Sequence, residues 1–186
     1  MKFKIKTIAL LAAAASAAAA LSGCGGGGNA EPSPAAQAQT GLSQEAQSEL
    51  TGRYSTYIES FISDVGAFVD GDLSDILQQA GEVDSGSLEE WKTKYQDGYE
   101  SVQHWYNEVS TAEMLCAEEN LEAHRSIVET VAAIYRILEG LEPRVQAAES
   151  GDFSRLSEKS GEYKQADTII KDMWQQSVEN VRSTLN

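Results

Sequence analysis

Cysteine, histidine and proline are all scarce in this 186-residue sequence, which has two, two and three of them. Two cysteines cannot form a disulfide-rich scaffold. Neither histidine fits the Glu-x-x-His pattern of di-iron bundles, because Glu100 precedes His104 by four positions and Asn120 precedes His124 by four. The segment Asp70–Asp75 resembles part of a calcium loop but lacks its later ligand positions. We therefore expect no metal and no bound cofactor.

Basic residues are also few, with 14 against 29 acidic residues and a net charge of −15. Three of the lysines lie in residues 1–23, which contain no acid, so loss of that segment would leave a net charge of −18. A surface of this charge repels phosphate backbones, and we expect no nucleic acid partner. It also argues against adsorption to anionic lipid through a basic patch.

The N-terminal region has no apolar run long enough for a membrane span. Ile8–Leu21 is uncharged over 14 residues, which as a helix would reach about 21 Å, whereas the hydrocarbon core measures roughly 30 Å. The run follows the basic stretch Met1–Lys6 and ends in small residues. This order is typical of an export signal.

The signal ends in Leu21-Ser22-Gly23-Cys24, a leucine, two small residues and a cysteine. This resembles the lipobox of bacterial lipoproteins. The resemblance implies a diacylglycerol on the sulfur of Cys24, cleavage by signal peptidase II between Gly23 and Cys24, and a new amino group open to acylation. It covers only the first 24 residues. The alternative is an ordinary secretory signal in which Cys24 has no role.

Residues 24–41 would then be a lipidated cysteine followed by a tether. Four glycines come directly after Cys24, and the rest is mostly alanine, glutamine, serine and proline without a large apolar side chain. Such a segment is flexible and reaches at most about 60 Å. We expect a domain over residues 42–186 on the extracytoplasmic face of the plasma membrane, or of an outer membrane if the host has one. Gly25 is not the aspartate that retains lipoproteins at the inner membrane.

From Leu42 onward, apolar residues recur every three or four positions and no stretch shows sustained strand alternation. The pattern predicts an all-α protein, an antiparallel bundle of about four long helices with two short connecting helices. The long helices are expected near 43–69, 87–109, 111–139 and 153–184, and the short ones near 72–80 and 142–149.

Capping signals and glycines set these boundaries. Ser87 and Ser110 each stand three residues before a glutamate, which matches the capping box. Glycines, among them Gly140 and Gly151, stand where helices should end, and Pro143 suits the first turn of a short helix. The apolar register breaks near 116–120, however, so the turn predicted at Ser110 could lie there instead.

Neither Cys116 nor His124 indicates catalysis. The neighbours of Cys116 include Glu113 and Glu118, which would raise the pKa of its thiol, whereas a nucleophile needs a base and positive surroundings. His124 lies on an apolar stripe. We expect both side chains to be structural and the protein not to be an enzyme.

The aromatic residues are the best candidates for a binding site. Trp91, Trp105, Tyr135 and Trp174 are expected in core layers. Tyr99 and Tyr106 lie seven residues apart, one position past the apolar stripe, and could form a ledge at a groove, although they could also simply fill space between helices. We expect a binding domain whose partner is an envelope protein or a surface ligand. The alternative is a ligand sensor resembling the four-helix periplasmic domains of chemoreceptors.

Overall fold

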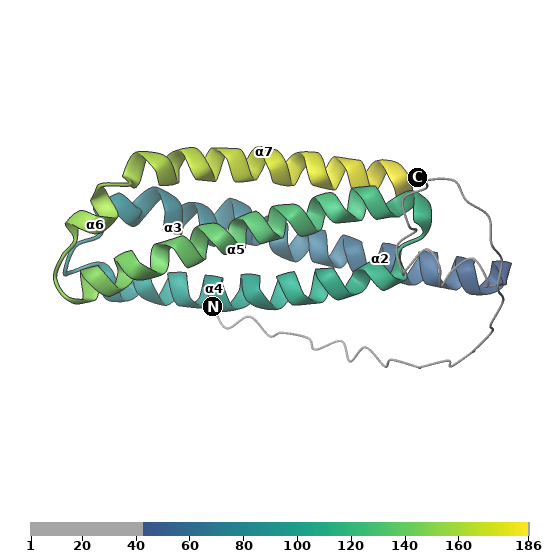
Figure 1. Ribbon diagram of the computed structural model, residues 1–186, viewed down its shortest axis with the longest axis horizontal. Coiled ribbons are helices and arrows are strands. Elements are labelled where there is room, and N and C mark those ends of the chain that lie inside the picture. The colour runs from purple at the N-terminus through teal and green to yellow at the C-terminus, as the bar shows by residue number, and fades with distance from the viewer. Residues whose placement is uncertain (1–42, 186) are drawn as a thin grey trace, which may run out of the picture. The chain divides into compact units, whose positions relative to one another are not determined.

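The computed structural model describes residues 43–185, and this part of the chain is an all-α antiparallel bundle (Figure 1), which confirms the predicted fold class. Cys24, the tether over 24–41 and Leu42 lie outside the described residues. The long helices are α2 (Gln44–Phe68), α4 (Leu88–Ala112), α5 (Leu121–Glu149) and α7 (Ser160–Leu185). The short helices are α3 (Ser74–Gln79) and α6 (Ser154–Ser157). A turn at 158–159 separates α6 from α7, so the single long helix predicted near 153–184 is wrong.

Helix α2 does not stop before Gly71, contrary to the predicted break. The backbone continues through a π-helical turn, Val69–Leu73, directly into α3. A helical glycine costs about 1 kcal/mol, but Val69 and Leu73 on either side of Gly71 are completely buried. Packing of these two side chains therefore holds the helix together across the glycine.

The turn between α4 and α5 lies at 113–120 rather than at Ser110, so the predicted capping box there is wrong and the alternative position is correct. It contains the 3-10 turns Glu113–Leu115 and Glu118–Asn120. The hydroxyl of Ser110 donates to the carbonyl of Tyr106 at 2.6 Å instead of capping a helix. Because Val109 and Ala112 are both buried, α4 gains core contacts by continuing past Ser110.

Helix α5 runs without a break through Gly140 and Pro143, so the predicted helix end and the separate helix 142–149 are wrong. The buried residues Leu138, Leu141 and Val145 form one stripe across the region, and this burial outweighs the roughly 3 kcal/mol cost of an internal proline. The helix ends as predicted at Gly151, whose φ is 91°.

The backbone around Gly151 closes α5 with two hydrogen bonds. The amide of Gly151 donates to the carbonyl of Ala148, and the amide of Asp152 donates to that of Ala147, each at 2.9 Å. This is the Schellman arrangement, which needs a left-handed residue at the position of Gly151.

Helix α4 begins after Ser87 as predicted, but without the predicted capping box, and Asp84 instead holds the turn that precedes the helix. A carboxylate oxygen of Asp84 accepts from the amides of Gly86 at 2.9 Å and Ser87 at 3.0 Å. The side chain of Ser87 makes no capping bond to α4. A charged acceptor forms the stronger bond, and the hydrogen bonds from Ser87 and Gly86 lower the pKa of Asp84.

The bundle is held together at both ends by close contacts. A Cβ atom on Gly81 would lie 2.2 Å from Cβ of Ser160, so only glycine lets the end of α3 approach the start of α7 this closely. Toward the opposite end, Arg182 of α7 pairs with Glu59 in the middle of α2 at 3.4 Å, and the first turns of α2 extend past the end of α7 (Figure 1). Among the described helices, none has the length and apolar character to cross a membrane.

Candidate functional site

Tyr99 and Tyr106 of α4 enclose Tyr135 of α5, and we call these three residues the tyrosine stack. The ring centroids of Tyr99 and Tyr135 lie 5.3 Å apart, and those of Tyr106 and Tyr135 lie 6.2 Å apart, both pairs stacked. The hydroxyls of Tyr99 and Tyr135 are hydrogen-bonded at 3.0 Å. The sequence indicated Tyr99 and Tyr106 as a possible ledge, but it assigned Tyr135 to the core. Spacing along one helix does not show which side chain the neighbouring helix inserts.

The stack is the outer end of a longer row of rings. Tyr95 lies 6.2 Å from Tyr99, and Trp91 lies 5.9 Å from Tyr95. Trp91 donates its indole N–H to the carbonyl of Ile76 at 3.1 Å, and Tyr95 donates its hydroxyl to Leu138 at 3.1 Å. Exposure rises along the row, from 3% at Trp91 to 36% at Tyr106. The accessible ring of Tyr106 therefore rests on a row whose inner members are fixed in the core.

Carboxylates of α5 set the electrostatic potential beside the stack. The hydrogen bond to Tyr135, followed by burial, electrostatic coupling to Tyr135 and the negative charges of Glu139 and Glu142, raises the pKa of Tyr99 to about 12. Burial and the same two glutamates raise the pKa of Tyr95 as well. The phenols hence stay neutral at physiological pH. Within residues 43–185, neither Glu139 nor Glu142 takes part in an ion pair.

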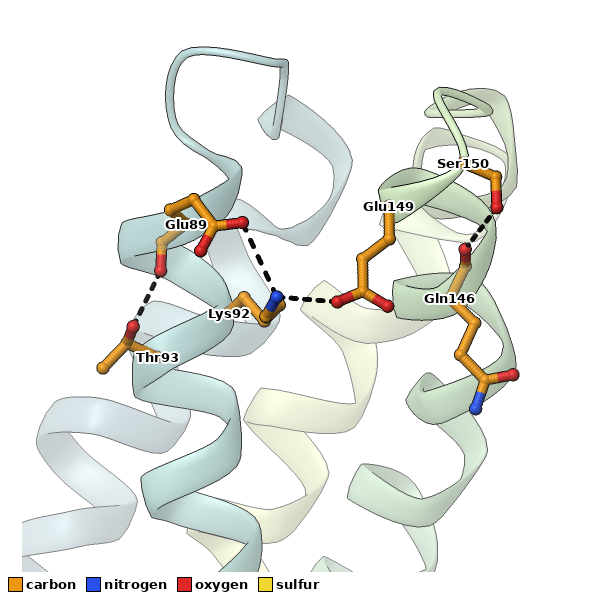
Figure 2. Close-up of polar contacts among 6 residues, drawn as sticks. All are labelled: Glu89, Lys92, Thr93, Gln146, Glu149 and Ser150. Atoms are coloured by element: carbon orange, nitrogen blue, oxygen red, sulfur yellow. Dashed lines mark hydrogen bonds and ion pairs between the residues drawn. The ribbon is translucent and has the colours of Figure 1, made fainter.

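The negative charge is compensated farther along the α4–α5 seam. Figure 2 shows Lys92 of α4 between two carboxylates, with its Nζ 2.6 Å from Glu149 of α5 and 3.5 Å from Glu89. The hydrogen bond to Glu149 raises the pKa of Lys92. The hydroxyl of Thr93 and that of Ser150 in the same view bond carbonyls of their own helices. Lys92 thus acts as a tie between α4 and α5. Among the described residues, no lysine or arginine makes such a tie at the tyrosine stack.

A buried polar group lies near the α4–α5 turn. Nε2 of His124 lies 3.0 Å from the carbonyl of Val109, and its Nδ1 lies 3.3 Å from the hydroxyl of Tyr54. His124 is completely buried, as the apolar stripe predicted, and this burial lowers its pKa. The neutral ring therefore links α2, α4 and α5 and is not exposed to substrates.

Cys116 lies beside this group and is also completely buried. Burial raises the pKa of its thiol to about 12, so the protonated form dominates at neutral pH. Nearby, the hydroxyl of Tyr57 and the amide oxygen of Asn120 are buried, and neither has a hydrogen-bond partner in the part of the chain that the structure describes. The thiolate that nucleophilic chemistry requires is disfavoured here.

Another buried charge joins α3 to α7. One carboxylate oxygen of Asp167 accepts from Gln78 at 2.8 Å and from Lys171 at 3.1 Å. Lys171 also donates to the hydroxyl of Ser74 at 2.8 Å. Asp167 is 3% exposed, and the sequence gave no sign of the contact between α3 and α7 because Gln78 is 89 residues away. The arrangement is an interhelical clamp.

A shallow polar cavity of about 410 Å³ lies where α5 meets α6. Its lining includes Pro143, Arg144, Gln146, Asp152 and Arg155. Arg144 donates to the carbonyl of Gly140 at 3.2 Å, and Nε of Arg155 lies 3.6 Å from Asp152. The cavity could admit a small anion, although its own acidic residues offset the two guanidinium charges.

The described residues contain no group of three or more histidine, cysteine or acidic side chains placed to hold a metal. His104 lies on the surface, 3.6 Å from Glu108. Cys24, the predicted lipid attachment residue, is outside the described part. Of the features described, the supported aromatic surface and the polar cavity are the ones accessible to a partner or ligand.

Comparison with known proteins gives no match to a family model, to a curated protein or to a solved structure.

Proposed function

We propose that this protein is a lipid-anchored extracytoplasmic binding module, without catalytic activity, that docks another envelope protein on its tyrosine stack. The observation that carries the proposal is the partly exposed ring of Tyr106, stacked on Tyr135 between α4 and α5. Tyrosine is favoured at binding hot spots because it provides a rigid apolar face and a polar tip at little entropic cost. The row of rings beneath Tyr106 keeps this surface pre-organised.

The anchor in this proposal is the acylated Cys24, and it rests on the motif Leu21-Ser22-Gly23-Cys24. More than one acyl chain would hold the domain firmly at the membrane. Wild-type protein from the host is expected to partition into the detergent phase, and Cys24→Ala protein into the aqueous phase. Equal partitioning of the two, or mature protein that keeps residues 1–23, would contradict the anchor.

Docking on the stack can be tested by photocrosslinking in intact host cells. A photoreactive amino acid at the exposed Gln103, between Tyr99 and Tyr106 on α4, keeps all three tyrosines in place. The matched control carries the same amino acid at the exposed Asp172 of α7. We expect one discrete adduct, identified by mass spectrometry, from position 103 and none of that mass from position 172.

Tyr106→Ala in the Gln103 probe protein should abolish the adduct without changing the amount of folded protein. Tyr106 is 36% exposed, so its truncation should cost little stability. The absence of an adduct at 103, identical adducts at both positions, or an adduct insensitive to Tyr106→Ala would each refute docking on the stack.

A second candidate is the small-ligand sensor, and the polar cavity at the α5–α6 end is the observation that favours it. A carboxylate or phosphate ligand there should raise the melting temperature of wild-type protein. Arg144→Gln/Arg155→Gln protein should lose that shift, while Arg136→Gln, at an exposed position outside the cavity lining, should keep it. No shift with inorganic phosphate or succinate would count against this candidate.

A further inference from the structure

We propose that the partner of the tyrosine stack presents arginine to it, as part of a basic segment. This inference rests on the proposed docking function and specifies its chemistry. The stack combines two features that suit a guanidinium, namely aromatic rings and carboxylates without a cation.

The two carboxylates belong to the same face as the stack. Glu139 and Glu142 follow Tyr135 on α5 by four and seven residues, which places all three on one side of the helix. Both glutamates are exposed, and both influence the pKa of Tyr99 and Tyr95 across the seam. Their charges therefore act where the rings of α4 and α5 meet.

A cation from this chain does not neutralise these charges in the described region. The lysine of the same seam, Lys92, is already shared by Glu89 and Glu149. Arg136, next to Tyr135 in the sequence, makes no ion pair within residues 43–185, and its position is about 100° around α5 from that of Tyr135. The stack therefore offers a partner uncompensated negative charge.

Arginine fits this combination better than lysine. Its planar guanidinium can lie on an aromatic ring and simultaneously donate two parallel hydrogen bonds to a carboxylate. A lysine ammonium is a strongly hydrated point charge that does not stack as a plane. The net charge of −15 would attract either residue over distance, but only the contact geometry discriminates between them.

Binding of a fluorescent tetra-arginine peptide at physiological salt tests the inference. The receptor is the mature-length chain carrying Cys24→Ala, and binding is followed by fluorescence anisotropy. Glu139→Gln/Glu142→Gln should weaken binding about three- to tenfold, as expected for surface ion pairs combined with cation–π contact. Tyr106→Ala should weaken it by a similar factor. Tetra-lysine should bind the wild type more weakly than tetra-arginine does.

The matched control is Glu122→Gln/Glu129→Gln, which removes the same charge from exposed positions on another face of α5. It should change binding less than twofold. If the two double variants lost affinity for tetra-arginine equally, net charge alone would explain the effect, and the inference would be overturned. Equal affinity for lysine and arginine peptides would also overturn it.

The inference and the docking function can fail separately. If Gln103 crosslinks one partner in a Tyr106-dependent manner but the Glu139/Glu142 variant crosslinks equally well, docking stands and the arginine contact is wrong. If the probe at 103 gives no adduct in cells, the docking function itself is wrong.

Discussion

The hydroxyl of Tyr54 lies 3.3 Å from Nδ1 of His124, whose completely buried imidazole has its tautomer fixed by the contact on the other side of the ring. The carbonyl of Val109 can only accept, so Nε2 of His124 must carry the proton and donate to it at 3.0 Å. Nδ1 is then an acceptor for Tyr54. Three helices meet at this neutral ring, and its protonation would add a charge where burial disfavours one.

The first prediction concerns the pH dependence of stability. Burial lowers the pKa of His124 in the native state, while the unfolded chain takes up this proton near pH 6.5. Below about pH 6.5 the unfolded state therefore binds more protons, and the free energy of unfolding falls as pH falls. Urea denaturation at a series of pH values between 7.5 and 5.5 would measure the slope.

The two histidines provide matched variants for this measurement. His124→Gln should flatten the slope more than His104→Gln, which lies on the surface beside Glu108 and leaves the buried imidazole in place. Burial raises the pKa of Glu108, so its native carboxyl takes up protons first and opposes the loss at lower pH. A slope that both histidine variants share with the wild type would exclude His124 as its source.

The second prediction compares two glycines. An alanine Cβ at Gly81 would lie 2.2 Å from Cβ of Ser160, so Gly81→Ala should lower the free energy of unfolding by about 1–3 kcal/mol. Gly140, in the exposed middle of α5, has no atom within 4 Å of such a Cβ, and Gly140→Ala should raise it by about 0.5–1 kcal/mol. Circular dichroism in urea distinguishes the two, and changes of the same sign would contradict the close approach of α3 and α7.

The third prediction concerns the interhelical clamp. Asp167→Asn removes the charge that faces Lys171 and weakens the bond from Gln78. We expect a loss of about 1–3 kcal/mol, because the half-buried lysine keeps its charge without its partner. Asp172→Asn, exposed on the same helix, should change stability by less than about 0.5 kcal/mol. If both variants changed the free energy of unfolding equally, the clamp at Asp167 would not contribute more to stability than an exposed aspartate does.

The fourth prediction concerns the tie in Figure 2. Lys92→Met removes the bridge from Glu89 and Glu149 but keeps an apolar stem. Partly exposed ion pairs contribute about 0.2–1 kcal/mol and are screened by salt. The difference in stability between variant and wild type should therefore be small and shrink further in 1 M sodium chloride. A larger, salt-independent loss would indicate packing rather than charge.

The sequence predicted helices well wherever an apolar stripe was continuous. It failed where residues that break isolated helices were overridden by burial. Gly71 and Pro143 both lie inside helical backbone because side chains on either side of them are buried in the core. Local propensity cannot register such long-range packing.

The candidate site was predictable only in part, for a similar reason. The spacing of Tyr99 and Tyr106 along α4 indicated a shared face, but the insertion of Tyr135 between them depends on how α4 and α5 are offset. The clamp at Asp167 joins segments distant in sequence. Contacts of this kind form between helices, and they do not appear as a periodic pattern in the sequence.

The ion pair between Glu59 and Arg182 places the end of the last long helix beside the middle of the first one, whose N-terminal turns continue past it in the same direction (Figure 1). Whatever is joined before α2 or after α7 must consequently leave the bundle at one pole (Figure 1). With a lipid at Cys24, a reporter fused behind Leu185 would therefore leave the bundle at the same pole as the tether. The connections at 83–87 and 150–153 lie at the other pole (Figure 1), which such a fusion leaves uncovered.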